Sequence, residues 1–206
     1  RPRALAASFL MAATVAAALW PWAWRNHQVT GHWVVTTLWS GPSLYDGLNP
    51  EATGESDMAF FDRDRLPAKM SEWEVNQRYW NAAVQYAKDH PRRTLELAVA
   101  KSQRFWKPWP SAEEPTNWRI KGAGGVGSIL LLAGSLAGLW FVRRRITALA
   151  LTAGPVLFFA VLHSVFVGSV RYRLPAEHAL AVLAAAGGWE LWRRWSARAS
   201  VVKGPS

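Results

Sequence analysis

Long apolar runs and short basic clusters alternate along this chain. Four runs, at residues 4–24, 122–142, 146–170 and 174–192, are almost free of charge, and arginines flank most of their ends. At about 1.5 Å per residue, each run is long enough to cross a hydrocarbon core of about 30 Å as a helix. The pattern predicts an all-α membrane protein with about four transmembrane helices.

The first run also has features of a secretory signal peptide, because Arg1 and Arg3 precede it and small residues occupy positions 16–18. It is longer than the roughly 7 to 15 apolar residues of a signal-peptide core. It ends in the sequence WPWAW at residues 20–24, which is typical of an aromatic belt at a membrane interface. We therefore favour a transmembrane span over a signal peptide.

Between the first two runs, residues 25–121 contain no segment able to cross a membrane, so we expect an α-rich external loop domain. Residues 32–39 are rich in β-branched and aromatic side chains and could form a short strand. Residues 49–69 combine Pro, Gly and mixed charge, which is typical of an irregular loop.

Two helices are expected in the second half of this loop. Ser71 and Glu74 have capping-box spacing and predict a helix over about 72–89, and Pro91 suits the first turn of a second helix ending before Pro108. The second helix carries a stripe that either lies on the membrane surface or packs inside the domain. The stripe consists of Leu95, Ala98, Val99, Ser102, Phe105 and Trp106.

The run at 122–142 contains Gly124, Gly127, Gly134, Ala137 and Gly138, small residues that let membrane helices approach closely. Pro155 predicts a kink in the third run. We thus divide the chain into a first span (1–24), an external loop domain (25–121), three transmembrane helices (122–192) and a tail (193–206).

Basic clusters near span ends fix the orientation, because short basic flanks stay in the cytoplasm. In a four-span arrangement, Arg1 with Arg3, residues 143–145, and Arg193 with Arg194 all fall on one side. We expect an integral protein of the bacterial inner (plasma) membrane with both termini in the cytoplasm. The loop domain and the turn that contains Arg171 and Arg173 then face outward.

Composition agrees with a membrane protein more than with a nucleic-acid-binding one. The net charge is +10, but the basic residues lie beside apolar runs rather than on one face, and 14 tryptophans suit membrane interfaces. We expect no nucleic-acid partner. The absence of cysteine excludes disulfides and thiolate chemistry.

The segment Arg171-Tyr172-Arg173-Leu174-Pro175 places two guanidinium groups where topology alone does not call for them. A guanidinium matches a phosphate with paired donors and stays charged at a membrane boundary. A lipid-linked phosphate is therefore one expected partner. Ordinary lipid headgroups, or an ion pair with Glu177 one helical turn after Arg173, are the alternatives.

Two motifs in a fixed order carry a resemblance to a known class. Residues 21–26 (PWAWRN) end a span, and residues 171–175 (RYRLP) precede the last Ala/Leu-rich span. In this order the chain resembles the C-terminal part of GT-C class glycosyltransferases, the protein O-mannosyltransferase and aminoarabinose-transferase-like enzymes. The resemblance implies transfer of a sugar from a polyprenyl-phosphate donor to an acceptor on the outer face of the membrane. Neither the sugar nor the acceptor follows from it.

The resemblance also implies that the general base lies upstream, so that this chain is the C-terminal part of a longer protein and contains no catalytic residue of its own. It requires no metal or other cofactor. Asp57, Asp62 and Asp64 are candidate acids, but the alternating charges of residues 62–65 are typical of a solvated surface. The competing functions are a sensor or assembly factor with a partner-binding loop, and a transporter fragment.

Further candidate substrate-binding residues are Arg25, Asn26, Tyr172 and His163. Arg25 and Asn26 follow the Trp belt and either approach the donor or, for Arg25, extend to the interface. His163 precedes Arg171 by eight residues, about 12 Å along a helix, where it lines a lipid-tail groove or bonds a neighbouring helix. Trp106, Trp109 and Trp118 either stack on a sugar or anchor the chain at the membrane interface.

Overall fold

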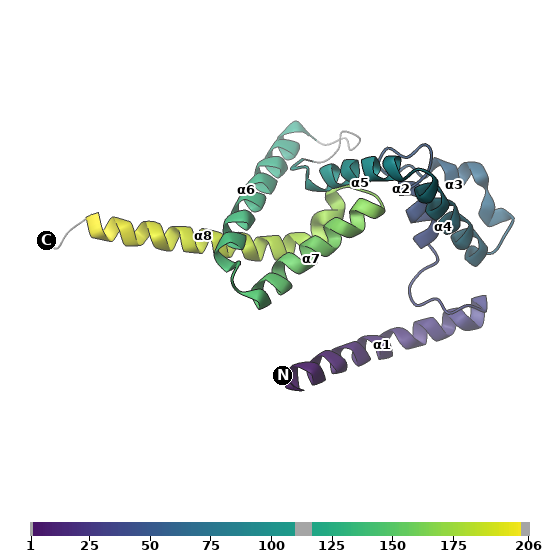
Figure 1. Ribbon diagram of the computed structural model, residues 1–206, viewed down its shortest axis with the longest axis horizontal. Helices are drawn as coiled ribbons and strands as arrows, with labels where there is room; N and C mark the ends of the chain where they lie inside the picture. The colour runs from purple at the N-terminus through teal and green to yellow at the C-terminus, as the bar shows by residue number, and fades with distance from the viewer. Residues whose placement is uncertain (1, 110–116, 203–206) are drawn as a thin grey trace. The chain divides into compact units, whose positions relative to one another are not determined.

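The computed structural model describes residues 2–109 and 117–202, and every regular element in these ranges is helical (Figure 1). The chain forms two compact units. Unit 1 comprises residues 1–50 and 57–89, and unit 2 comprises residues 51–56 and 90–206. Arg1, part of the predicted external loop (110–116) and the end of the predicted tail (203–206) lie outside the described residues.

Unit 1 contains α1 (Pro2–Thr30), α2 (Ser40–Gly47), α3 (Ala59–Asp64), the 3₁₀ helix η1 (Leu66–Ala68) and α4 (Glu72–Asp89). Its core is a cluster of Phe60, Leu66, Val75 and Tyr79, in which aromatic rings from α2, α3 and α4 meet. The buried Asn76 amide oxygen on α4 accepts from the Gly41 N–H at 2.7 Å and thereby caps α2.

The predicted strand at residues 32–39 is wrong, because this segment has no regular structure and no partner strand in the described chain. Side chains of α1 bind its carbonyls instead: Trp22 Nε1 donates to Thr36 O at 3.0 Å, and Asn26 Nδ2 donates to Val34 O at 2.9 Å. The aromatic residues pack locally too, since the Trp33 ring lies 4.3 Å from the His27 ring. Two of the carbonyls that a strand would pair are therefore already used.

Residues 49–69, expected to be an irregular loop, include α3 and η1. Burial of Phe60 and Leu66 against α4 explains why this Pro- and Gly-containing stretch becomes helical. The predicted helix at 72–89 is confirmed as α4. Its capping box forms as expected: the Ser71 N–H and hydroxyl both donate to Glu74 Oε2 at 2.8 Å.

Unit 2 contains α5 (Pro91–Trp106), α6 (Trp118–Val142), α7 (Ile146–Val165), the 3₁₀ helix η2 (Val170–Arg173) and α8 (Leu174–Val202). The expected second helix of the loop is therefore present as α5, but it belongs to unit 2 rather than to a separate loop domain. It packs on α7 and η2 through Leu97, Lys101 and Phe105. The predicted stripe only partly coincides with the buried face: Phe105 is buried, whereas Leu95, Val99 and Trp106 are exposed.

α6 and α8 cross closely, as Figure 1 shows within this unit. A Cβ atom added to Gly138 would overlap the Leu183 backbone, and one added to Gly134 would lie 3.0 Å from the Ala184 Cβ. The buried Ser135 hydroxyl lies 2.8 Å from the Leu180 carbonyl oxygen and bonds the two helices together. Of the predicted small residues, Gly134 and Gly138 thus permit a close helix crossing.

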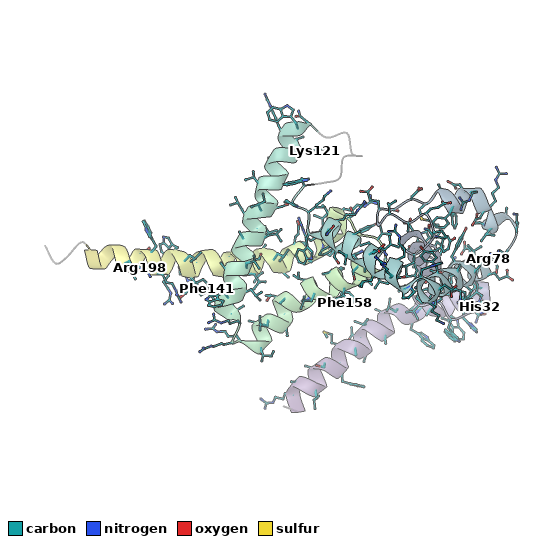
Figure 2. The ribbon with its side chains drawn as sticks, turned by 45° about the horizontal axis from the view of Figure 1, so that its top comes forward. His32, Arg78, Lys121, Phe141, Phe158 and Arg198 are labelled. Carbon is teal, nitrogen blue, oxygen red and sulfur yellow. The ribbon has the colours of Figure 1, made fainter. Side chains whose placement is uncertain are left out.

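Within the described residues, three helices are long and apolar enough to span a membrane: Arg3–Thr30, Trp118–Val142 and Ile146–Val165. Their large apolar side chains are widely exposed, such as Phe158 on α7 (Figure 2). The predicted third span is shorter than expected, ending at Val165 rather than at residue 170. α8 carries Glu177, His178 and Glu190 within its apolar stretch and is not among the three.

Candidate functional site

The turn between α7 and α8 brings the predicted RYRLP segment to the end of two apolar helices. α7 ends at Val165, residues 166–169 turn without regular structure, and η2 leads directly into α8. The first three residues of this segment differ in exposure: Arg171 is exposed, Tyr172 is half-buried and Arg173 is fully buried.

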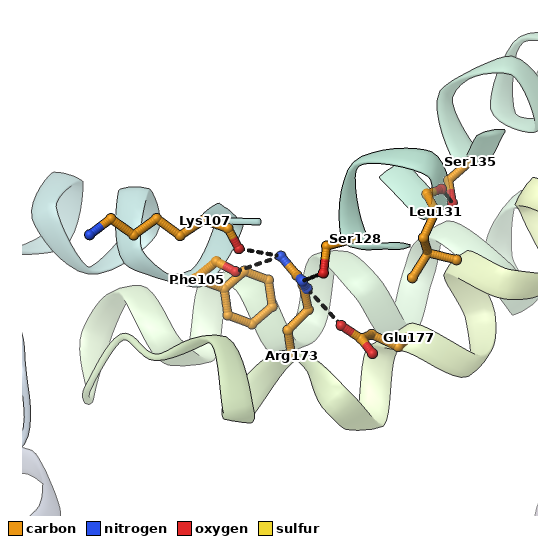
Figure 3. Close-up of polar contacts among 7 residues, drawn as sticks. All are labelled: Phe105, Lys107, Ser128, Leu131, Ser135, Arg173 and Glu177. Carbon is orange, nitrogen blue, oxygen red and sulfur yellow. Dashed lines mark hydrogen bonds and ion pairs between the residues drawn. The ribbon is translucent and has the colours of Figure 1, made fainter. Parts of the chain in front are cut away.

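Arg173 is enclosed by protein acceptors (Figure 3). Its Nη1 donates to the Phe105 and Lys107 carbonyl oxygens at 3.2 and 3.0 Å, and its Nε donates to Glu177 Oε1 at 3.0 Å. Its Nη2 donates to Ser128 Oγ at 3.3 Å. Because the group is 0% exposed and bonded on all three nitrogens, it has no free paired donors for a phosphate. The predicted phosphate contact from Arg173 is corrected to a structural role.

The surroundings of Arg173 compensate the cost of burying its charge. Glu177 supplies a carboxylate, and the two carbonyls belong to the C-terminal end of α5, where the helix dipole favours a cation. The guanidinium connects α5, α6 and α8 in one contact. The ion pair with Glu177, an alternative left open by the sequence, is present.

A second buried cation holds the start of the turn. Lys101 on α5 is 0% exposed, and its Nζ donates at 2.6 Å to the carbonyl oxygen of Val165, the last residue of α7. Gly168 packs on the Lys101 backbone so closely that an added Cβ would overlap it, and the Gly168 N–H donates to Gly54 O at 3.3 Å. α5 and residues 51–56 therefore fix the backbone from which Arg171 projects.

Tyr172 and His163 form a stacked pair beside the turn. Their ring centroids lie 4.6 Å apart with planes 6° from parallel, and His163 Nδ1 lies 3.1 Å from Val167 O. Because a carbonyl only accepts, Nδ1 carries the proton in this arrangement. His163 lies in the last turn of α7, because this helix ends at Val165 and not at residue 170. The expected ~12 Å of helix between His163 and Arg171 is therefore not formed. Its hydrogen bond joins the following turn rather than a neighbouring helix.

Arg171 is the cation of this turn that remains accessible. Its guanidinium carbon lies 5.2 Å from the Tyr172 ring centroid, so the aromatic face holds it by a cation–π contact. Its one hydrogen bond among the described residues is a long one, 3.5 Å to the Tyr172 hydroxyl, and no described carboxylate pairs with it. Most of its donors are free to bind an anion.

Arg171 and Tyr172 line a cavity of about 620 Å³ that lies within unit 2. Its polar lining includes the hydroxyls of Ser56, Ser128 and Ser169 and the carboxylates of Glu55 and Glu177. Both carboxylates already have cationic partners, since Glu55 pairs with Arg104 and Glu177 with Arg173. One wall is apolar and includes two glycines. It is formed by Gly124, Gly127 and Leu131 of α6 with Leu174 of α8.

This lining can bind an anionic head group with an apolar extension. The volume is within the roughly 300 to 1,000 Å³ typical of small-molecule sites. Hydroxyls and the Arg171 guanidinium are suitable donors for phosphate oxygens, and the α6 wall continues along an apolar, membrane-length helix. The predicted residues Arg171 and Tyr172 thus meet at one cavity, with His163 behind Tyr172.

Arg25 and Asn26 belong to unit 1, whereas the other predicted substrate-binding residues belong to unit 2. Asn26 is committed to a local role through its bond to Val34 O. Arg25 is exposed, with its guanidinium carbon 5.7 Å from the Trp22 ring centroid. Binding of the lipid-linked sugar donor by these two residues stays a prediction.

The acidic segment 57–64 has structural contacts in unit 1. Asp64 Oδ2 accepts from the Tyr79 hydroxyl at 3.1 Å and Asp57 Oδ1 accepts from the Ala59 N–H at 3.0 Å. Within the described residues, no three His, Asp or Glu side chains are grouped as metal ligands would be. Trp106, Trp109 and Trp118 are all exposed.

Sequence reasoning missed Lys101, Ser128 and Glu55, which hold or line the site. Leu97, Lys101 and Phe105 are spaced by four residues, so the period of α5 could have placed Lys101 on its buried face. No comparable signal exists for Ser128 or Glu55, because only packing brings α6 and residues 51–56 to the turn.

Comparisons of the chain with protein-family models, with curated proteins and with solved structures found no match.

Proposed function

We propose that this chain is the C-terminal part of a membrane glycosyltransferase that takes a sugar from a polyprenyl-phosphate donor. One observation carries the proposal: Arg171, without a carboxylate partner among the described residues, lines a cavity of about 620 Å³ beside apolar, membrane-length helices. A lipid-linked phosphate combines the anion that suits Arg171 with the chain that suits the α6 wall. The sequence resemblance supports the same function.

In this mechanism Arg171 binds the donor phosphate and stabilises the charge that grows on it as the sugar departs. Tyr172, held by His163, keeps the guanidinium in place through its ring. Arg173 is a positioning residue that fixes the turn. The general base that deprotonates the acceptor belongs to the sequence upstream, and the chemistry needs no metal. The acceptor and the sugar are left open.

The proposed arrangement in the membrane uses α1, α6 and α7 as spans and α8 as a fourth. Basic clusters at residues 143–145 and 193–194 then lie in the cytoplasm, and the cavity lies at the outer face of the bacterial inner membrane. Glu177 of α8 is offset by its pair with Arg173, which lowers the cost of placing this helix at the membrane.

The test is transfer from a radiolabelled polyprenyl-phosphate sugar by the full-length protein in native membranes. We expect Arg171→Ala to lower transfer by about 10- to 100-fold, the effect of losing a charged hydrogen bond of about 1.5–3 kcal/mol. Arg171→Lys should restore part of the activity, because it keeps the charge but loses the paired donors.

The matched control is Arg92→Ala, which removes an equal charge from an exposed position on α5. Transfer that is unchanged in Arg171→Ala would exclude the phosphate role. A wild-type protein that binds the donor in a filter assay but transfers no sugar would instead support the sensor or transporter alternative.

A further inference from the structure

A second cavity, of about 380 Å³, lies wholly within unit 1 and is separate from the residues proposed to bind the donor. It lies where the start of α2, the α3–η1 region and the first turn of α4 meet. Two aromatic rings form one corner: Trp39 and Phe61 lie 4.9 Å apart with planes inclined by 57°. Trp39 is 46% exposed, so its ring is available to a ligand.

The rest of the lining combines rigid apolar surface with two hydrogen-bonding groups. Pro42 and Pro67 form firm walls, and Thr37 and Glu72 supply a hydroxyl and a carboxylate. Neither Thr37 nor Glu72 has a side-chain hydrogen bond or ion pair with the residues that the structure describes. Both can therefore bind a ligand without breaking a protein contact.

These properties exclude several classes of ligand. A phosphate or other anion would meet the Glu72 carboxylate with no cation in the lining to offset the repulsion. A purely apolar group, such as a lipid chain, would cover the Thr37 and Glu72 oxygens without giving them partners, which is costly.

A neutral sugar ring satisfies the whole lining at once. One face of a pyranose consists of C–H groups that pack on an aromatic ring, and its hydroxyls donate to a carboxylate and exchange hydrogen bonds with a threonine. We propose that this cavity is a binding site for a pyranose, with Trp39 as the stacking platform and Glu72 as the hydroxyl acceptor. The inference is independent of sugar transfer, because every lining residue belongs to unit 1.

The test uses the full chain in nanodiscs of phosphatidylglycerol and phosphatidylethanolamine, because alkyl-glycoside detergents would themselves supply a sugar. Methyl glucopyranoside, methyl galactopyranoside and methyl mannopyranoside are titrated and followed by saturation-transfer NMR. We expect at least one to bind with a Kd on the order of 1 mM. Saturation should reach the carbon-bound hydrogens of one ring face, as stacking on Trp39 requires.

Variants then test whether the pyranoside binds at this cavity. Trp39→Ala should weaken binding by about tenfold, Trp39→Phe should weaken it less because a ring remains, and Glu72→Ala should weaken it without changing the saturated face. The matched control is Trp80→Ala, which removes another exposed tryptophan of unit 1 that does not line the cavity.

Three results would overturn the proposal. The first is that no methyl pyranoside binds, and the second is that Trp39→Ala leaves binding unchanged. The third is that a phosphocholine probe binds in place of the sugars, which would make the cavity a cation-binding site. The saturated ring face is measured in the wild-type protein, so this readout does not depend on whether a variant folds. Far-UV circular dichroism of each variant identifies any that do not.

Discussion

Arg171 and Arg173 are two positions apart in η2 and carry the same group, but four protein acceptors surround Arg173 while Arg171 faces a cavity. A guanidinium whose donors are all used stabilises the fold, and one whose donors are free can bind a ligand. The local spacing explains the difference: in a 3₁₀ helix, neighbouring positions face different directions. Mutations at the two positions should therefore separate stability from activity.

We expect Arg173→Ala to lower the free energy of unfolding by about 3–5 kcal/mol, because Glu177 and two α5 carbonyls lose a buried cationic partner. Arg171→Ala should change it by less than about 0.5 kcal/mol, since this side chain is exposed. Thermal unfolding of the purified protein in nanodiscs measures both, with Arg92→Ala as the exposed control. Equal stability of the two variants would contradict the division of roles.

At the level of elements, α4 begins with a capping box whose strength depends on pH. The Ser71 backbone N–H, and then its side chain, hold the pKa of Glu74 below its ordinary value of 4.5. A carboxyl with a lowered pKa in the folded state adds stability above its unfolded pKa. That stability is lost as the pH falls through the folded value.

We therefore expect the first turn of α4 to lose hydrogen-exchange protection as the pH falls from the ordinary glutamate value of 4.5 through the lowered folded-state value, and to keep it at neutral pH. Glu74→Gln should remove most of this pH dependence. The adjacent Glu72→Gln should leave it in place, because Glu72 makes no hydrogen bond to the cap. Equal pH dependence in the wild type and in Glu74→Gln would show that another group is responsible.

At the scale of the whole molecule, the topology depends on whether α8 crosses the membrane. Its helix runs from Leu174 to Val202 and extends well beyond its crossing with α6, towards Arg198 (Figure 2). A crossing α8 places residue 196 in the cytoplasm, whereas three spans leave it on the same side as the cavity. The arrangement of basic clusters favours the crossing.

Because the chain has no cysteine, single-cysteine variants report topology without background. In intact spheroplasts, a membrane-impermeant maleimide should label Ser56→Cys and should label Ser196→Cys only after permeabilisation. The first residue lines the cavity and the second follows the basic cluster at 193–194. Labelling of both from outside would show that α8 does not cross.

The sequence by itself determined the elements whose signals are local. The Ser71–Glu74 spacing located α4, Pro91 located the start of α5, and uninterrupted apolar length identified α1, α6 and α7 as membrane-length helices. Local signals failed where long-range contacts decide. Residues 32–39 have the composition of a strand, but two of their carbonyl oxygens accept hydrogen bonds from the side chains of Trp22 and Asn26 on α1.

Tertiary structure alone decided which arginine is available. The sequence placed both at one turn, but whether a guanidinium is free depends on acceptors that lie 66 and 68 positions away at the end of α5. The same holds for Lys101, whose partner is the last carbonyl of α7, and for the Trp39–Phe61 corner in unit 1. The physical reason is that a side chain's hydrogen bonds and burial belong to the packed fold, while helix length and capping belong to adjacent residues.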